Sequence, residues 1–149
     1  MRTSLILVFV LTTCFAFAQG QKSYFYHNQD GAIKGYDPVA YFLDNKPVKG
    51  SEDITYEWKN AVWHFKSVEN LELFRANPTK YAPQYGGYCA YAVAKGYTAK
   101  VDPLAWKIID GNLYLNYNES VQKNWVEDLN KYIERAEENW PAIVGMSDL

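Results

Sequence analysis

An alternating stretch near residue 60 constrains the fold more than any other part of the sequence. In ITYEWKNAVWHF, residues 54–65, apolar and polar residues alternate on both sides of Lys59-Asn60, which suits a two-residue turn. The pattern therefore predicts an antiparallel hairpin that places His64 opposite Thr55 on its polar face. On the other face it predicts three apolar cross-strand pairs: Trp58 with Ala61, Tyr56 with Trp63, and Ile54 with Phe65.

Turn and cap signals predict the elements that follow. Ser67 is a good N-cap for a helix over VENLELFRAN, which ends before Pro78. Gly86-Gly87 forms a corner, and the alanines in YCAYAVA, residues 88–94, favour a helix after it. In AWKIIDGNLYLNY, residues 105–117, the Asp-Gly pair is typical of a type I′ turn and predicts a second hairpin.

The C-terminal part has the pattern of a long amphipathic helix. Over residues 120–140 apolar side chains recur at steps of three and four, and Pro141 is expected to end the helix. These apolar residues are Val121, Trp125, Leu129, Tyr132, Ala136 and Trp140. Together with the two antiparallel β-hairpins, this helix predicts a small single-domain α+β fold in which the helices pack on the hairpins.

The first residues indicate export. Residues 1–18 carry Arg2, then an apolar run that ends in Ala16-Phe17-Ala18, as in a signal peptide cleaved before a periplasmic or secreted protein. Cys14 would leave with this segment, although lipidation of Cys14 is an open alternative. We expect a lead-in over residues 19–34 and a domain over residues 35–145, with no membrane span in the mature chain.

Charge and cysteine content narrow the chemistry. The net charge of −2 becomes more negative when Arg2 is removed, which argues against binding to nucleic acid or anionic membranes. Cys89 is then the one remaining cysteine, so no intramolecular disulfide can form. Its thiol is therefore buried, bound to a metal, reactive, or paired between two chains.

Residues 35–88 resemble the YHS domain family. In WHFKS, Trp63 stands for the family's tyrosine, while His64 and Ser67 match. The upstream GYDPVAYF is similar to the family's Asp-Pro-Val-Cys-Gly-Met entry segment. Together with YGGYCAYAV, DGNLYLNYN and NW further along, it resembles a secreted bacterial branch of the family. This similarity covers nearly all of the mature chain. The downstream F…NP.KY element matches at Phe74, Asn77, Pro78, Lys80 and Tyr81.

The resemblance implies a small module that senses or delivers a metal, because family members are often fused to copper-transporting ATPases. This chain has Ala40 in place of the family's entry-segment cysteine. Cys89 and His64 are then the candidate ligands, since Cu(I) accepts two or three sulfur or nitrogen donors. Copper is thus the expected metal, bound at a Cys/His site without catalysis.

Two further interpretations stay open. Free cysteines are often buried, so Cys89 is also expected as a small core residue in a metal-free module that binds a small ligand or a protein. The tyrosines near it, Tyr85, Tyr88, Tyr91 and Tyr97, would then line a pocket or the core. Catalysis is not expected, because the sequence contains no phosphate-binding glycine motif and no paired carboxylates. Asx turns explain the aspartates that precede Pro or Gly: Asp37, Asp102 and Asp110.

Overall fold

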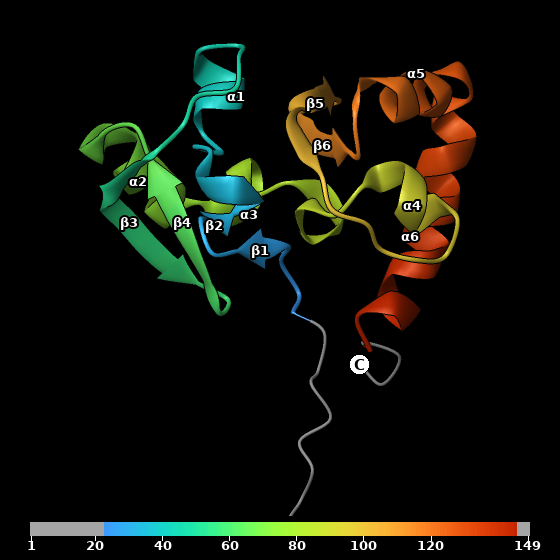
Figure 1. Ribbon diagram of the computed structural model, residues 1–149, viewed down its shortest axis with the longest axis horizontal. Coiled ribbons are helices and arrows are strands. Elements are labelled where there is room, and N and C mark those ends of the chain that lie inside the picture. The colour runs from blue at the N-terminus through green and yellow to red at the C-terminus, as the bar shows by residue number, and fades with distance from the viewer. Residues whose placement is uncertain (1–22, 146–149) are drawn as a thin grey trace, which may run out of the picture.

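The computed structural model describes residues 23–145 and has an α+β fold, as predicted. The signal peptide predicted over residues 1–18 lies outside the described residues. In the described part, three two-stranded antiparallel sheets pack with six α-helices (Figure 1). The strands are β1 (His27–Asn28), β2 (Gly31–Ala32), β3 (Ser51–Trp58), β4 (Ala61–Phe65), β5 (Asp102–Ile109) and β6 (Asn112–Asn116). The α-helices are α1 (Ala40–Leu43), α2 (Val68–Ala76), α3 (Pro78–Tyr81), α4 (Ala90–Ala94), α5 (Glu119–Glu127) and α6 (Leu129–Ile143).

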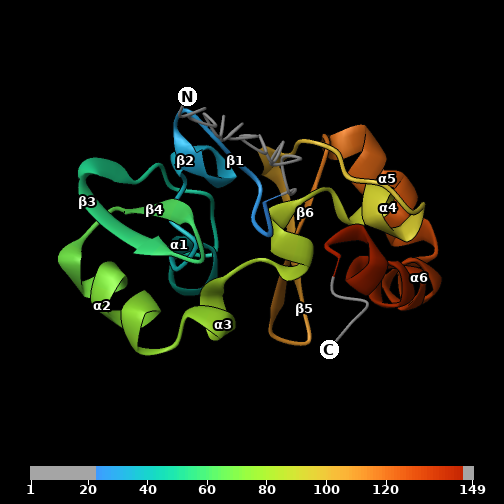
Figure 2. The ribbon, with the colours of Figure 1, turned by 90° about the horizontal axis from the view of Figure 1, so that it is seen from below.

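The elements form two halves. Strands β1–β4 and helices α1 and α2 lie on one side, and helices α4–α6 lie on the other, with β6 between them (Figures 1 and 2). The β1–β2 ribbon was not expected from the sequence, and it packs against β4. Residues 23–34, predicted as a lead-in, contribute Phe25 and Ile33 to the buried core.

The β3–β4 hairpin has the predicted turn. Lys59 and Asn60 have φ values of 49° and 59°, the left-handed geometry of a type I′ turn. Three predicted pairs are confirmed: Trp58 with Ala61, Tyr56 with Trp63, and Thr55 with His64. The predicted pairing of Ile54 with Phe65 is wrong, because a register shift between Ser51 and Thr55 places Phe65 opposite Ser51.

Most other local predictions are confirmed. The Ser67 hydroxyl accepts a hydrogen bond from the Asn70 N–H at 3.2 Å and caps α2, which ends at Ala76. The alanine-rich segment after the glycine corner is helix α4. In the β5–β6 hairpin, Asp110 and Gly111 form the turn with φ values of 49° and 78°.

The long C-terminal helix is confirmed over Leu129–Ile143, but the predicted continuity from residue 120 and the predicted end at Pro141 are wrong. The chain breaks at Asp128 (φ −138°, ψ 53°) into α5, capped by Asn118, and α6. Helix α6 continues past Pro141 to Ile143. Since Pro141 lies in the last turn, its missing N–H removes one hydrogen bond near an end that would fray in any case.

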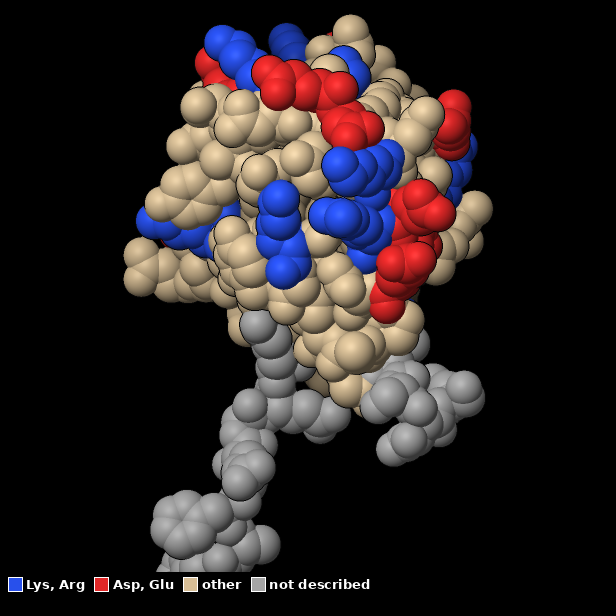
Figure 3. Space-filling model, turned by 90° about the vertical axis from the view of Figure 1, so that its right-hand side faces the viewer, with Lys and Arg blue, Asp and Glu red and all other residues tan. Residues whose placement is uncertain are grey.

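The outer face of α5 and α6 is ordinary charged surface. Figure 3 shows Lys and Arg side chains mixed with Asp and Glu on this side of the molecule. Lys131 and Asp128 form an exposed ion pair at 3.1 Å, one turn apart. None of the helices among residues 23–145 is long and apolar enough to cross a membrane.

Aromatic rings make up much of the core, in keeping with a sequence in which 17% of the residues are Phe, Trp or Tyr. The Phe74 ring lies 5.0 Å from Trp63 and 5.3 Å from Phe65, and none of the three is exposed. A second cluster, in the other half, contains Trp125 and Tyr114, whose ring centroids are 5.3 Å apart. Each half thus has its own aromatic centre.

A buried carboxylate joins two segments that the sequence analysis treated separately. Asp37 forms the expected Asx turn, in which Oδ1 accepts hydrogen bonds from Val39 N (2.8 Å) and Ala40 N (3.3 Å). Its Oδ2 accepts two more, from Lys66 N (2.9 Å) and Asn70 Nδ2 (2.7 Å). Asp37 therefore fixes the segment before α1 against the start of α2.

Candidate functional site

Cys89 is the N-cap of α4 and is separated from the corner at residues 85–87 by Tyr88 alone. Its side chain is 1% exposed, and its Sγ lies 3.7 Å from Asn116 Oδ1, to which the thiol donates. Burial raises the pKa of the Cys89 thiol, and backbone N–H groups at Ala92, Tyr117 and Tyr91 offset part of this rise. The thiol is therefore protonated at neutral pH, which disfavours metal binding because a metal takes the thiolate.

His64 lies on β4, in the other half of the molecule from α4 in both Figures 1 and 2. Its partly buried ring packs so closely on Gly31 that a Cβ there would be 2.8 Å from His64 Nε2. Among residues 23–145, no group of three or more His, Cys, Asp or Glu side chains is arranged to hold a metal. These placements give no support to a shared His64–Cys89 site, and copper binding stays a prediction.

One cavity, of about 320 Å³, lies beside Cys89. It is lined by Cys89, Tyr91, Ala92, Tyr97, Ala99, Tyr117 and Val121, a set without a charged side chain. Of the four tyrosines proposed from the sequence, Tyr91 and Tyr97 therefore line one pocket. Tyr85 lines a different one, while the Tyr88 hydroxyl donates to the Ser23 carbonyl at 2.9 Å.

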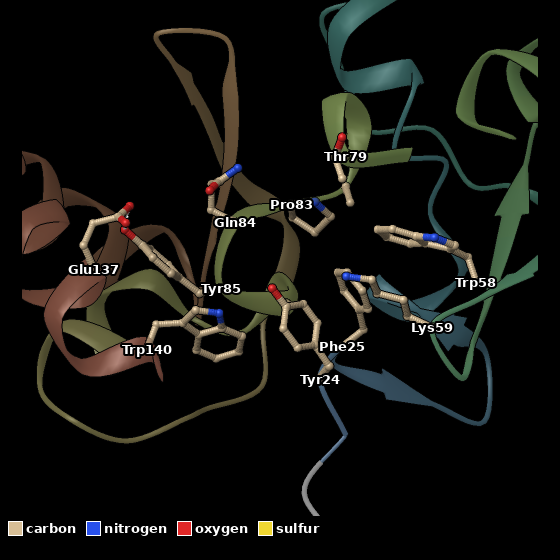
Figure 4. A pocket seen from close by; sticks show the side chains of 12 residues that line it. Tyr24, Phe25, Trp58, Lys59, Thr79, Pro83, Gln84, Tyr85, Glu137 and Trp140 are labelled. Atoms are coloured by element: carbon tan, nitrogen blue, oxygen red, sulfur yellow. Dashed lines mark hydrogen bonds between the residues drawn. The ribbon is translucent and has the colours of Figure 1, made fainter. Parts of the chain in front are cut away.

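Another cavity, of about 230 Å³, lies between the two halves, and we call it the aromatic cleft (Figure 4). In Figure 4, Trp58 and Lys59 enter it from the β3–β4 turn, and Trp140 and Glu137 border it on the α6 side. It is lined by Tyr24, Phe25, Trp58, Lys59, Thr79, Ala82, Pro83, Gln84, Tyr85, Gly86, Glu137 and Trp140. Five of these residues are aromatic, and two carry opposite charges.

The corner at η2 (Gln84–Gly87), a short 3-10 segment, shapes the floor of the aromatic cleft. Tyr85, Gly86 and Gly87 all have positive φ, at 52°, 61° and 75°. A Cβ on Gly86 would overlap the Tyr24 carbonyl oxygen, so only glycine allows this approach. Tyr26 N donates to the Gly86 carbonyl at 2.8 Å, which fixes the N-terminal segment across the corner.

Opposite charges border the aromatic cleft on its two sides. Lys59 Nζ lies 4.9 Å from the centre of the Tyr24 ring and 5.1 Å from that of Trp58, and it forms no ion pair within residues 23–145. Across the cleft, Glu137 Oε1 accepts a hydrogen bond from the Tyr85 hydroxyl at 3.2 Å. Burial, with the Glu137 charge in second place, raises the pKa of Tyr85 far above its usual value, so this hydroxyl stays a donor.

Sequence reasoning found only Tyr85 among the residues of the aromatic cleft. It missed Tyr24, Lys59, Glu137 and Trp140, which come from segments far apart in the chain. Left-handed geometry at Lys59 gave no usable signal, because Lys34 has the same geometry and does not line the cleft.

No family model matches this chain, and neither a curated protein nor a solved structure is significantly similar to it.

Proposed function

We propose that this chain is an exported, non-catalytic module of the YHS type that binds a small organic ligand in the aromatic cleft. The observation that carries the proposal is a single concave site with aromatic walls, one cation that forms no ion pair within residues 23–145, and one oriented carboxylate. Ligand sites in proteins have this composition, with apolar walls and a few fixed polar groups.

The volume of the aromatic cleft suits a ligand of one ring with a short substituent. Cavities for drug-sized ligands start at about 300 Å³, whereas a cavity of about 150 Å³ holds benzene. At about 230 Å³, this cleft lies between the two. The cavity beside Cys89 is larger, but its lining offers no charged group to orient a ligand.

Local chemistry supports binding without catalysis. A general base needs a pKa near the working pH, and the raised pKa of Tyr85 removes its hydroxyl from that role. Glu137 is held by Tyr85, and Lys59 lies over two rings. These contacts orient both charged groups for recognition.

The YHS resemblance belongs to the same proposal, since the entry segment and the start of α2 meet at Asp37. The copper hypothesis for His64 and Cys89 has a separate test, a Cu(I) titration of the purified protein against a chelator. Uptake that is lost in Cys89→Ala would support it, and absent uptake or equal uptake by Cys89→Ala would end it. Neither result bears on the aromatic cleft.

Indole N–H signals of the tryptophans test the ligand proposal directly. With 3-phenylpropionamide and 3-phenylpropionate as probes, we expect ¹⁵N–¹H shifts for Trp58 and Trp140, which line the cleft. The signals of Trp106 and Trp125, which do not line it, should stay in place. Trp58→Leu should abolish the response of Trp140, whereas the matched Trp106→Leu variant, also on a hairpin strand, should keep it.

Absence of any shift at Trp58 and Trp140 with either probe at millimolar concentration would refute ligand binding at this cleft. Equal shifts at all tryptophans would also count against it, because they would report weak contact over the whole surface.

A further inference from the structure

The geometry points to a specific ligand class for the aromatic cleft: we propose a small monocarboxylate that carries one flat ring, with its carboxylate on Lys59. This inference rests on the proposed function and adds the chemical class and the orientation of the ligand.

Lys59 is the group that selects a carboxylate. Its ammonium lies over the rings of Tyr24 and Trp58, at 4.9 Å and 5.1 Å, and in Figure 4 its side chain runs toward the centre of the cleft. Cation–π contacts of this kind hold the ammonium by its charge and leave its N–H donors available to a ligand. Since no carboxylate pairs with Lys59 in residues 23–145, a ligand carboxylate can complete its charge pairing.

Glu137 sets the orientation and limits the charge of the ligand. Its carboxylate lies across the cleft, where the Tyr85 hydroxyl donates to Oε1 at 3.2 Å. A second negative group on the ligand would meet this carboxylate, and the cleft lining contains no cation besides Lys59 among residues 23–145. Dianions such as phosphate esters are therefore disfavoured, and the neutral end of the ligand lies toward Glu137.

The aromatic walls select a flat ring. Tyr24 stands edge-on to Trp140, with centroids 5.5 Å apart and planes at 76°, so their faces are not stacked on each other. Trp58 and Tyr85 add further ring surface to the lining. A ligand ring can pack against these faces and edges in the offset or T-shaped arrangements that aromatic pairs prefer.

A comparison of matched probes tests this class. By calorimetric or NMR titration, 3-phenylpropionate should bind at least about tenfold more tightly than the uncharged 3-phenylpropionamide, a difference of about 1.4 kcal/mol. Lys59→Met, or Lys59→Gln if the first variant folds poorly, should remove this difference, because it weakens binding of the carboxylate far more than binding of the amide. Lys95→Met is the matched control, because Lys95 also lies over two rings, Tyr91 and Tyr132, but outside the cleft.

Two further arms separate the parts of the inference. Raising the salt from about 0.05 to about 0.5 M should weaken binding of the carboxylate and not of the amide. The saturated 3-cyclohexylpropionate should bind less tightly than the aromatic acid, and 2-phenylethylamine less tightly still.

Each contrary result has a distinct meaning. Equal affinity for acid and amide, or an unchanged preference in Lys59→Met, overturns the carboxylate inference while the binding function stands. Tighter binding of the amine assigns recognition to Glu137 and overturns the orientation. Equal binding of the saturated acid overturns the flat ring, and failure of all probes to shift Trp58 and Trp140 removes the proposed function itself.

Discussion

Replacing Asp37 by asparagine should cost far more stability than its position in a turn suggests. The two carboxylate oxygens accept four hydrogen bonds, two from the adjacent backbone and two from Lys66 N and Asn70 Nδ2. Asparagine has one oxygen, so its NH₂ group must face two donors at either position. Each buried donor left without an acceptor costs about 1–3 kcal/mol, and relief of the buried charge offsets part of the sum. We expect a net loss of about 3 kcal/mol in the free energy of unfolding.

Equilibrium urea unfolding gives this quantity, provided that the slope m is unchanged. Asp102→Asn is a matched control because Asp102 also precedes a proline in an Asx turn. Its Oδ1 accepts one bond, from Leu104 N at 3.0 Å, at an exposed site. We expect a loss of less than about 1 kcal/mol there. If the two variants lose equal stability, the argument that Asp37 joins two segments is refuted.

Two other sites give predictions of the same kind. Gly86→Ala should lower the free energy of unfolding by about 3 kcal/mol or prevent folding, because φ is 61° and a Cβ would meet the Tyr24 carbonyl. The control is Gly96→Ala, where φ is 91° and the space around the residue is open; it should cost about 1 kcal/mol in the same urea assay. Cys89 should resist iodoacetamide until the protein unfolds, and rapid labelling of the native protein would contradict its burial. Folding raises the pKa of Cys89, so the thiol of the unfolded chain ionises first as the pH rises above about 8.5. The contribution of Cys89 to the free energy of unfolding is therefore fully present below this pH and is lost as the pH rises further. Cys89→Ala should reduce this loss.

The alternation of apolar and polar residues predicted the turn of the β3–β4 hairpin and the strand pairs next to it, but not the bulge farther along. The turn at Lys59-Asn60 and the pairs nearest to it depend on alternation and turn geometry, and these were readable. At the bulge before Thr55 the chain enters β3 close against β4, where a Cβ on Gly50 would lie 2.7 Å from His64 Cβ. Alternation alone carries no information about that approach.

The break between α5 and α6 was hidden for a related reason. Trp125 and Leu129 are four residues apart, so the apolar stripe stays in phase across Asp128. Periodicity therefore predicts one helix, although the backbone turns there and each part packs on α4 in its own direction. Packing decided the geometry where the pattern allowed two outcomes.

The corner at residues 85–87 shows why the candidate site differs from the one expected. The sequence predicted a corner at Gly86-Gly87, with the candidate ligand Cys89 shortly after it. In the structure, the three consecutive positive φ values turn Tyr85 toward Glu137 and bring Gly86 under Tyr24, while the Cys89 thiol turns inward to Asn116. The same backbone geometry thus buries the sulfur and builds the floor of the aromatic cleft. Since the cleft needs contributions from both ends of the chain, its chemistry emerges only when α6 and the N-terminal segment pack on this corner.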